Sequence, residues 1–445
     1  MTATSSNLSL DDLLERPRLA PVQRRVIIIC LLMAVLDGFD AQTIGYAAPA
    51  IGAELGVTPA AFATVFSVGL LGMALGSVLF GSLADRIGRR TVILLCVAVF
   101  ALCTLAVVLT NAFALLLVLR FVAGLGLGGA TPSLIALSAE YTPQRLRSTV
   151  VMVIVGALPL GAFLGGVLAA VLIPAFGWRS VFLVGGSLPF LMLIVAVLWL
   201  PESLHRLAAR GPEERFKRVA RGLAPEGVGT IVWQSQARVV KSGGAAPVGV
   251  LFRGRRRMDT ALLWITFFST LLALFLLLNW LPTLLHQSGM VQSAAVVATA
   301  GFSLGGFVGS IVLGQVIDRR RRPFGPLLFG YAVAIVFTAA TAFSTGSVVL
   351  VVAFAVVMGF GLIGCQTGIS AVAASLYPAD ARGTGVGWAF GVGRVGSILG
   401  PALAGGLLTV GLAPAAVIAF AAAPTALAAL GLAGLARRAD NTEKV

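Results

Sequence analysis

Charged residues are scarce in this chain. Only 11% of its 445 residues are charged and 58% are hydrophobic, and the mean hydropathy is +0.99. Because a soluble domain carries about 25% charged residues, this composition excludes a water-soluble globule and a disordered chain. The few cysteines all lie in apolar runs, which excludes a disulfide-linked secreted scaffold. What remains is an all-α polytopic membrane protein.

Motifs for nucleotide and metal chemistry are also missing. The sequence has no P-loop and no H-E-x-x-H, so we expect neither an ATP-driven pump nor a zinc hydrolase. Gly124, Gly126 and Gly129 spell G-x-G-x-x-G, but they lie in an apolar run with no preceding strand. We interpret them as a face for close helix packing. We therefore expect no enzyme activity, no metal ion and no cofactor other than protons as the coupling ion.

Twelve apolar runs are long enough to cross a bilayer, which takes about 20 residues per helix. They cover residues 24–50, 60–84, 91–110, 112–139, 148–174, 178–200, 259–286, 292–317, 324–344, 347–377, 382–411 and 413–436. The predicted organisation is a tail (1–23), a six-helix bundle (24–200), a central loop (201–257), a second six-helix bundle (258–436) and a tail (437–445).

The basic residues indicate the orientation in the membrane. Outside the runs, Lys and Arg lie almost entirely in the loops on the side of the two termini, and the other set of loops contains only Arg179. The positive-inside rule then predicts that both termini are cytoplasmic, in a bacterial inner membrane. The net charge of +15 is thereby explained by lipid headgroups, and no nucleic-acid partner is expected.

A loop motif occurs once in each half. G-x-x-x-D-R-x-G-R-R follows the second run, and a related segment follows the eighth run at an offset of 233 residues. We expect its glycines to allow a close helix approach and a tight bend, and its acids and arginines to form a latch that stabilises one access state. The motif residues are Gly81, Asp85, Arg86, Arg89 and Arg90, with Asp318, Arg319 and Arg322 in the second copy. Two pseudo-symmetric six-helix bundles around a central substrate site are a transporter architecture.

Two aspartates lie deep in the first run. Asp37 and Asp40 are spaced i, i+3 and therefore share one helical face. An acid inside the membrane is a functional candidate, and we predict that this pair carries a proton. Two alternatives remain: a packing acid paired with an arginine, and a sodium site, which would need more oxygen ligands than the pair supplies.

The candidate substrate site contains two arginines. Arg394 lies near the middle of the eleventh run and Arg120 in the outer part of the fourth, and a guanidinium group binds a carboxylate through two hydrogen bonds. Either arginine could hold an anionic substrate or neutralise an aspartate of the first run. Rings and amides could line the same cavity, although each also fits packing or an interface anchor. The candidates are Phe39, Tyr46, Asn279, Trp280, Gln366 and Trp388.

Three segments carry a resemblance to a known family. They are residues 37–40 (Asp-Gly-Phe-Asp), 279–284 (Asn-Trp-Leu-Pro-Thr-Leu) and 381–388 (Ala-Arg-Gly-Thr-Gly-Val-Gly-Trp). Over nearly its whole length the chain resembles the aromatic acid:proton symporters of the major facilitator superfamily. The resemblance implies that the aspartates of the first run and the first loop motif are needed for transport, and it places Arg120 in the substrate path. Many relatives have a glutamine within the segment matching 301–306, a difference that bears on substrate choice.

These observations predict a secondary active transporter. We expect proton-coupled uptake of an aromatic carboxylate, such as 4-hydroxybenzoate, benzoate or a related hydroxylated acid, by alternating access in a monomer. Moving a monoanion into a negative interior costs about 2.3 kcal/mol per 100 mV, and one co-transported proton cancels that charge. A proton-coupled exporter or antiporter of aromatic acids or drugs fits the same residues. A membrane receptor is a further alternative, but it would need a signalling domain.

Overall fold

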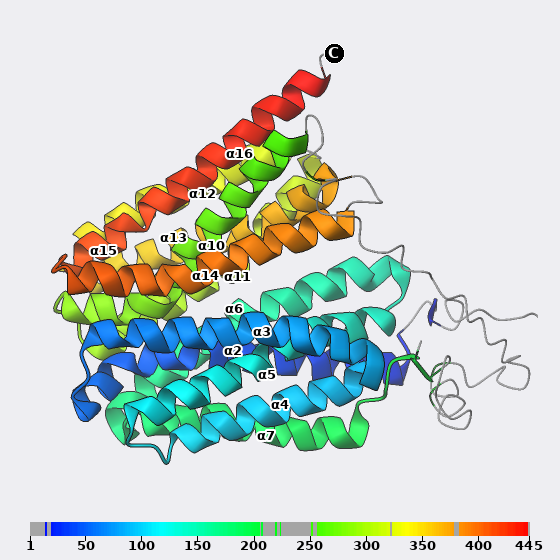
Figure 1. Cartoon of the computed structure of the whole chain (residues 1–445), viewed down its shortest axis with the longest axis horizontal. Coiled ribbons are helices and arrows are strands. Elements are labelled where there is room, and N and C mark those ends of the chain that lie inside the picture. Colours follow the sequence, from blue (N-terminus) through cyan, green and yellow to red (C-terminus); the bar gives the residue numbers. More distant parts are fainter. Residues whose placement is uncertain are drawn as a thin grey trace, which may run out of the picture.

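The structure is a computed structural model that describes residues 14–15, 19–204, 206–207, 219, 223, 251, 256–320, 323–377 and 382–443. Within these residues it contains twelve helices long and apolar enough to cross a membrane, as the sequence predicts (Figure 1). Most of the predicted N-terminal tail and central loop lies outside the described residues, as do Arg322 and the side chains of Asp85 and Asp318.

The N-terminal half contains six long helices and one short 3-10 helix. These elements are α2 (Pro21–Leu55), η1 (Pro59–Ala61), α3 (Phe62–Ile87), α4 (Arg89–Val107), α5 (Phe113–Glu140), α6 (Gln144–Phe176) and α7 (Arg179–Trp199). The first of them is the longest, because α2 runs for 35 residues through Pro49.

The C-terminal half repeats the arrangement. It contains α10 (Arg256–Gln287), α11 (Gln292–Arg320), α12 (Phe324–Phe343), α13 (Val348–Leu376), α14 (Arg382–Thr409), α15 (Pro414–Phe420) and α16 (Ala422–Glu443). The last predicted span, 413–436, is interrupted at Ala421, so that α15 and α16 cross the membrane as one broken helix.

Glycines set the closest helix contacts in both halves. A Cβ atom at Gly128 of α5 would collide with the Met73 carbonyl of α3, and one at Gly359 of α13 would collide with the Phe302 carbonyl of α11. The glycine run of α5 is therefore a packing face, as its composition suggests. The α3–α5 and α11–α13 pairs occupy equivalent places in the two halves, consistent with the repeat in the sequence.

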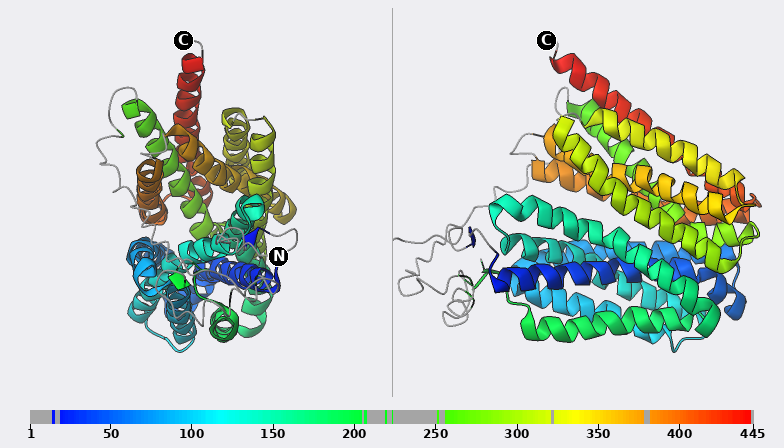
Figure 2. Two further views of the ribbon diagram at one scale, coloured as in Figure 1. Left: turned by 90° about the vertical axis from the view of Figure 1, so that its right-hand side faces the viewer. Right: turned by 180° about the vertical axis from the view of Figure 1, so that it is seen from behind.

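The two halves meet at one end of the molecule and diverge toward the other. Helix α2 begins and α16 ends at one end of the molecule, here called the terminal end, and we call the opposite end the distal end (Figures 1 and 2). Toward the distal end, Ser67 Oγ donates to the Ile398 carbonyl at 2.9 Å, and the Phe66 and Trp280 rings lie 5.5 Å apart. The ribbons of the two halves separate toward the terminal end (Figure 1). The structure is therefore closed at the distal end.

Candidate functional site

Packing holds the acidic face of α2 in place. A Cβ atom at Gly38 would collide with the backbone carbonyl of Leu158 in α6, so α2 and α6 touch directly between the two aspartates. The Phe39 ring fills the space beside Gly165 of α6 and Gly185 of α7. This contact orients the opposite side of α2, with Asp37 and Asp40, toward α4 and α5. Phe39 is therefore a core residue of the N-terminal half.

Asp40 belongs to a polar cluster inside the N-terminal half. Its side chain is fully buried, and Thr104 Oγ1 of α4 donates to Asp40 Oδ1 at 2.6 Å. Arg120 of α5 places Nη1 at 3.7 Å from Asp40 Oδ2, and its guanidinium lies over the Phe182 ring, 4.9 Å from the ring centre. Arg120 is only 4% exposed. Its position makes it the counter-ion of Asp40, held by an aromatic face of α7.

Asp37 faces the other half of the molecule. Thr131 Oγ1 of α5 donates to Asp37 Oδ2, whereas Oδ1 has no hydrogen-bond partner among the described residues. The side chain is 1% exposed. Asp37 interacts electrostatically with Asp40 and with Arg394 of α14, which is only partly buried. Asp37 and Arg394 therefore act on each other electrostatically across the two halves, without a direct ion pair between them among the described residues.

The structure thus gives the two aspartates different cationic neighbours, an ion pair for Asp40 and a longer-range electrostatic interaction for Asp37. Asp40 and Arg120 lie within one half, and Asp37 and Arg394 belong to opposite halves. Each pair is neutral when its members are charged. A change in the distance between the halves leaves the first pair intact and alters the second, so only the second pair can respond to an access change or to a ligand between the halves.

Most of the predicted rings and amides are already engaged. Tyr46 Oη donates to the Ala162 carbonyl at 2.8 Å, and Trp280 Nε1 donates to the Pro401 carbonyl at 3.0 Å. Asn279 Nδ2 donates to the Phe275 carbonyl of its own helix at 2.8 Å. All three side chains are buried, so in this conformation they are structural elements of the closed distal region.

Two of the predicted substrate residues retain an open surface. Trp388 of α14 is 46% exposed and stacks on Trp264 of α10, with ring centres 6.0 Å apart. Gln366 is half-buried on α13. These two side chains and Arg394 are the sequence-predicted residues of the C-terminal half that a ligand could reach without rearranging the core.

The loop motif after α3 is tied to the end of α7. Arg89 pairs with Glu140 of α5, while Arg90 donates to the Leu200 carbonyl at 2.6 Å and the Val197 carbonyl at 2.7 Å. Gly88 adopts a φ of 105°, which makes the bend that the motif predicts.

The other described residues of the two loop motifs make fewer contacts with neighbouring helices. A Cβ atom at Gly81 would meet no neighbour, so the close helix approach expected there is wrong. The backbone carbonyl of Arg86 accepts from Arg206 at 2.9 Å, and Arg319 is exposed in the last turn of α11.

Sequence reasoning missed several polar partners. Thr104 and Thr131 hold the aspartates, and Glu202 accepts from the backbone N–H of Arg90 at 3.1 Å. Hydroxyl side chains in apolar runs are a weak signal, because most of them bond to their own helix. Glu202 stands directly after the sixth run, where a carboxylate among basic residues could have been singled out.

A hydrolase-like motif is also present in the sequence and has a structural explanation. Residues 301–305 spell G-x-S-x-G, the pattern of a nucleophile elbow. These residues lie inside α11, and Ser303 Oγ donates to the Thr299 carbonyl one turn earlier at 3.4 Å. A nucleophile elbow requires a sharp turn between a strand and a helix, so this segment is not one.

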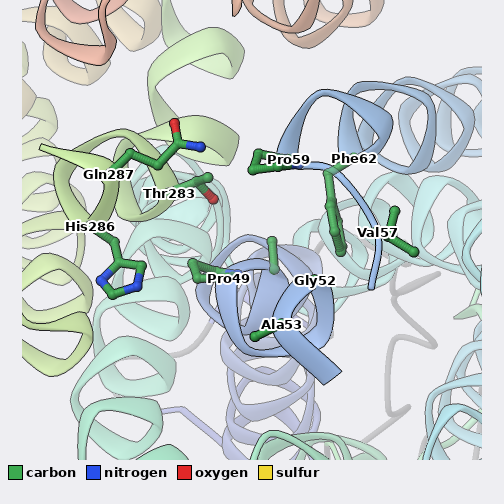
Figure 3. Close-up of a pocket in the computed structure, with 10 residues that line it drawn as sticks. Pro49, Gly52, Ala53, Val57, Pro59, Phe62, Thr283, His286 and Gln287 are labelled. Atoms are coloured by element: carbon green, nitrogen blue, oxygen red, sulfur yellow. The ribbon is translucent and has the colours of Figure 1, made fainter. Parts of the chain in front are cut away.

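A cavity of about 260 Å³ lies between the halves at the distal end (Figure 3). The hydroxyl of Thr283 has no hydrogen-bond partner among the described residues. The cavity lies far along α2 from the aspartates and marks the outer side of the closed contact. Its lining comes from α2, η1, α3 and α10 and comprises Ala48, Pro49, Gly52, Ala53, Val57, Pro59, Phe62, Thr283, His286 and Gln287.

Comparison with known proteins identifies the family. The sequence model of the Major Facilitator Superfamily matches residues 30–401 and, in a second match, residues 290–445. The chain belongs to the Major Facilitator Superfamily. Its members are transporters, so this superfamily protein is not an enzyme.

Within the superfamily the chain is related to aromatic acid transporters. It is 35% identical to the 4-hydroxybenzoate transporter PcaK of Pseudomonas putida, with 99% of each chain covered. It is 37% identical to the gallate transporter of Pseudomonas putida, with 96% of this chain and 94% of the relative covered. It is 31% identical to the benzoate transport protein of Acinetobacter baylyi, with 92% and 88% covered.

Solved structures show the same fold. A bacterial homologue of the human lysosomal transporter Spinster, solved in an inward-facing and unoccupied conformation, superposes with a TM-score of 0.70 at 17% identity. The match covers 94% of this chain and 96% of that structure. The twelve-helix architecture is thus that of a superfamily transporter.

Proposed function

We propose that this protein takes up a single-ring aromatic carboxylate together with a proton, across a bacterial inner membrane, by alternating access as a monomer. The names of the related transporters support the substrate class, and the buried acids support the coupling ion. The terminal end is the cytoplasmic end in this proposal, because the basic loops lie there. The distal end then faces the periplasm, and the structure represents the inward-open state.

The observation that carries the proposal is the buried position of Asp37, together with its electrostatic interaction with Arg394 of the opposite half. A substrate carboxylate that binds Arg394 competes with Asp37 for one guanidinium group. Two carboxylates beside one cation are most stable when one of them is protonated. Binding of the anion therefore favours a proton on Asp37, and by reciprocity the proton favours binding of the anion.

The roles of the arginines differ in this mechanism. Arg394 binds the substrate carboxylate from the C-terminal half, and Trp388 and Gln366 of the same half are the candidates for contact with the ring. Arg120 remains paired with Asp40 throughout and contributes a neutral, rigid wall. The Arg89–Glu140 pair and the Arg90 contacts hold the cytoplasmic ends of α4, α5 and α7 together as the halves rock.

The first test is uptake into proteoliposomes. Labelled 4-hydroxybenzoate should accumulate above its outside concentration when a proton gradient points inward, and a protonophore should abolish the accumulation. Unlabelled benzoate, gallate and 4-hydroxybenzoate compete in parallel, and their ranking gives the preferred ring substitution. If only the reverse gradient moves substrate, by driving loss from preloaded vesicles, the protein is an exporter and the proposed direction is wrong.

The second test addresses Arg394. Replacing it with glutamine removes a charge-assisted hydrogen bond, which should raise KM on the order of ten- to a hundredfold. Arg179→Gln is the matched control, since Arg179 binds Glu54 and Asn111 at the distal end of the N-terminal half. Equal KM values for Arg394→Gln and the parent protein would show that Arg394 does not bind the substrate.

A further inference from the structure

A proline leaves one backbone carbonyl of α10 without its usual partner. In an α-helix, the carbonyl of residue 278 accepts from the N–H of residue 282. Residue 282 is Pro282, which has no N–H, although α10 continues through it to Gln287. The Leu278 carbonyl is therefore orphaned in a part of α10 whose neighbours Leu277 and Leu281 are fully buried. A buried carbonyl in this state costs free energy unless another donor reaches it.

The other half of the molecule supplies that donor. Gln42 of α2 is 5% exposed, and its Nε2 donates to the Leu278 carbonyl. Gly45 lies beside this bond: a Cβ atom there would stand 3.1 Å from Gln42 Nε2 and in ordinary contact with the Asn279 and Leu278 carbonyl oxygens, at 3.4 and 3.5 Å. Gln42 also lies two residues beyond Asp40, so the bond joins the helix that carries both aspartates to α10.

A second hydrogen bond between the halves makes a useful contrast. Ser67 Oγ of α3 donates to the Ile398 carbonyl of α14 at 2.9 Å. That carbonyl keeps a helical donor, because residue 402 is an alanine with an N–H inside the same helix. Loss of the Ser67 hydroxyl therefore leaves no orphaned group, whereas loss of the Gln42 amide does.

We propose that Gln42 is a positioning residue of the transport cycle, whose amide satisfies the Leu278 carbonyl only while the distal end is closed. Opening this end separates α2 from α10 and breaks the bond from Gln42. The Leu278 carbonyl is then hydrated or left without a donor. Pro282 thus creates an acceptor that the opposite half must satisfy, and the bond favours the closed distal end. The proposal concerns the access equilibrium alone and does not depend on which substrate or ion is carried.

The test measures how often the distal end opens. Ala48 is 2% exposed and lines the distal cavity between α2 and α10, so a cysteine there should react slowly while this contact is closed and faster when it opens. Full-length protein carrying Ala48→Cys, with Cys30, Cys96, Cys103 and Cys365 replaced by alanine, is purified and treated with a hydrophilic maleimide. Gln42→Met keeps the side-chain length and removes the donor, and it should raise the labelling rate about tenfold.

Two further variants separate the bond from simple packing. Pro282→Ala gives the Leu278 carbonyl a donor within α10, so adding Gln42→Met to it should change labelling by no more than about twofold. Ser67→Ala is the matched control and should also stay within about twofold of the parent. If Gln42→Met has a large effect alone and a small effect beside Pro282→Ala, the orphaned Leu278 carbonyl is the partner through which Gln42 acts.

Other outcomes would overturn the proposal. Labelling of Gln42→Met at the parent rate would show that the amide does not bias the equilibrium. An equal increase in the Pro282→Ala background would show that Gln42 acts by packing alone. If Gln42→Met fails to fold, the double variant decides: recovery with Pro282→Ala supports the proposal, and failure in both backgrounds contradicts it.

Discussion

At the scale of single residues, the two aspartates of α2 differ in their surroundings although they share a helical face. Asp40 contacts Thr104 and Arg120, so the partners of its charge lie within the N-terminal half. Each aspartate has one oxygen without a hydrogen-bond partner among the described residues, but the arginine that acts on Asp37 is Arg394 of the opposite half. Neutralising one or the other aspartate should therefore have different consequences.

We expect Asp37→Asn to uncouple transport without unfolding the protein. The variant should exchange labelled for unlabelled substrate across the vesicle membrane but should not accumulate substrate against a gradient, because the proton site is lost. Counterflow and gradient-driven uptake, measured on the same vesicles, distinguish the two activities. Full accumulation by this variant would contradict the role assigned to Asp37.

Asp40→Asn should instead destabilise the fold. It leaves Arg120 buried without a counter-ion, a loss of about 3–5 kcal/mol for a broken buried pair. The thermal unfolding of the purified protein reports this loss. The double variant Asp40→Asn/Arg120→Gln should recover most of the stability, and a single variant as stable as the parent would show that Arg120 is not the partner of Asp40.

The sequence predicts the charged residues of the candidate site but not the contacts between them. Asp37, Asp40, Arg120 and Arg394 could be predicted because a charge inside an apolar run is costly and therefore conspicuous. Their pairing could not, because the arginines lie far from α2 in sequence and only the packed helices show which aspartate each one meets. Thr104 and Thr131 were missed for the same reason, since nothing local indicates which face of α4 or α5 meets α2.

At the scale of helices, glycine contacts determine where α2 can lie. Gly38 sets α2 directly on the backbone of α6, and Gly161 of α6 meets the Val35 carbonyl of α2 in the same way. The twelve spans could be predicted from hydropathy alone, but the break at Ala421 and the open surroundings of Gly81 could not. Hydropathy reports which segments are buried in lipid or protein and carries no information about which neighbour each glycine meets.

Gly38→Ala is therefore expected to destabilise the protein. The added methyl group meets the Leu158 carbonyl, which belongs to a helix backbone and cannot move aside, and overpacking of this kind costs about 1–3 kcal/mol. The matched control is Gly406→Ala in α14, where a Cβ atom meets no neighbour. The control should unfold at the parent temperature or above it, because alanine favours helix over glycine by about 1 kcal/mol.

At the scale of the whole molecule, the charge pairs predict how transport responds to voltage. Both pairs are neutral before binding, and one anion with one proton keeps the occupied site neutral. The loaded carrier then moves no net charge, so a potassium diffusion potential of 100 mV should change the initial uptake rate by less than about twofold at fixed pH. A strong acceleration by an inside-negative potential would indicate a second proton and would require Asp40 to titrate as well.

The length of α2 links this protein to the thickness of its membrane. A helix of 35 residues is about 52 Å long, whereas the hydrocarbon core is about 30 Å thick. Such a helix must cross at a slant or extend beyond the lipid tails. In the proposed cycle α2 changes its angle to α10 when the distal contact opens, so the two access states present different hydrophobic heights to the bilayer. Lipids with shorter or longer acyl chains should therefore favour one state over the other, so that the bilayer itself acts on the cycle.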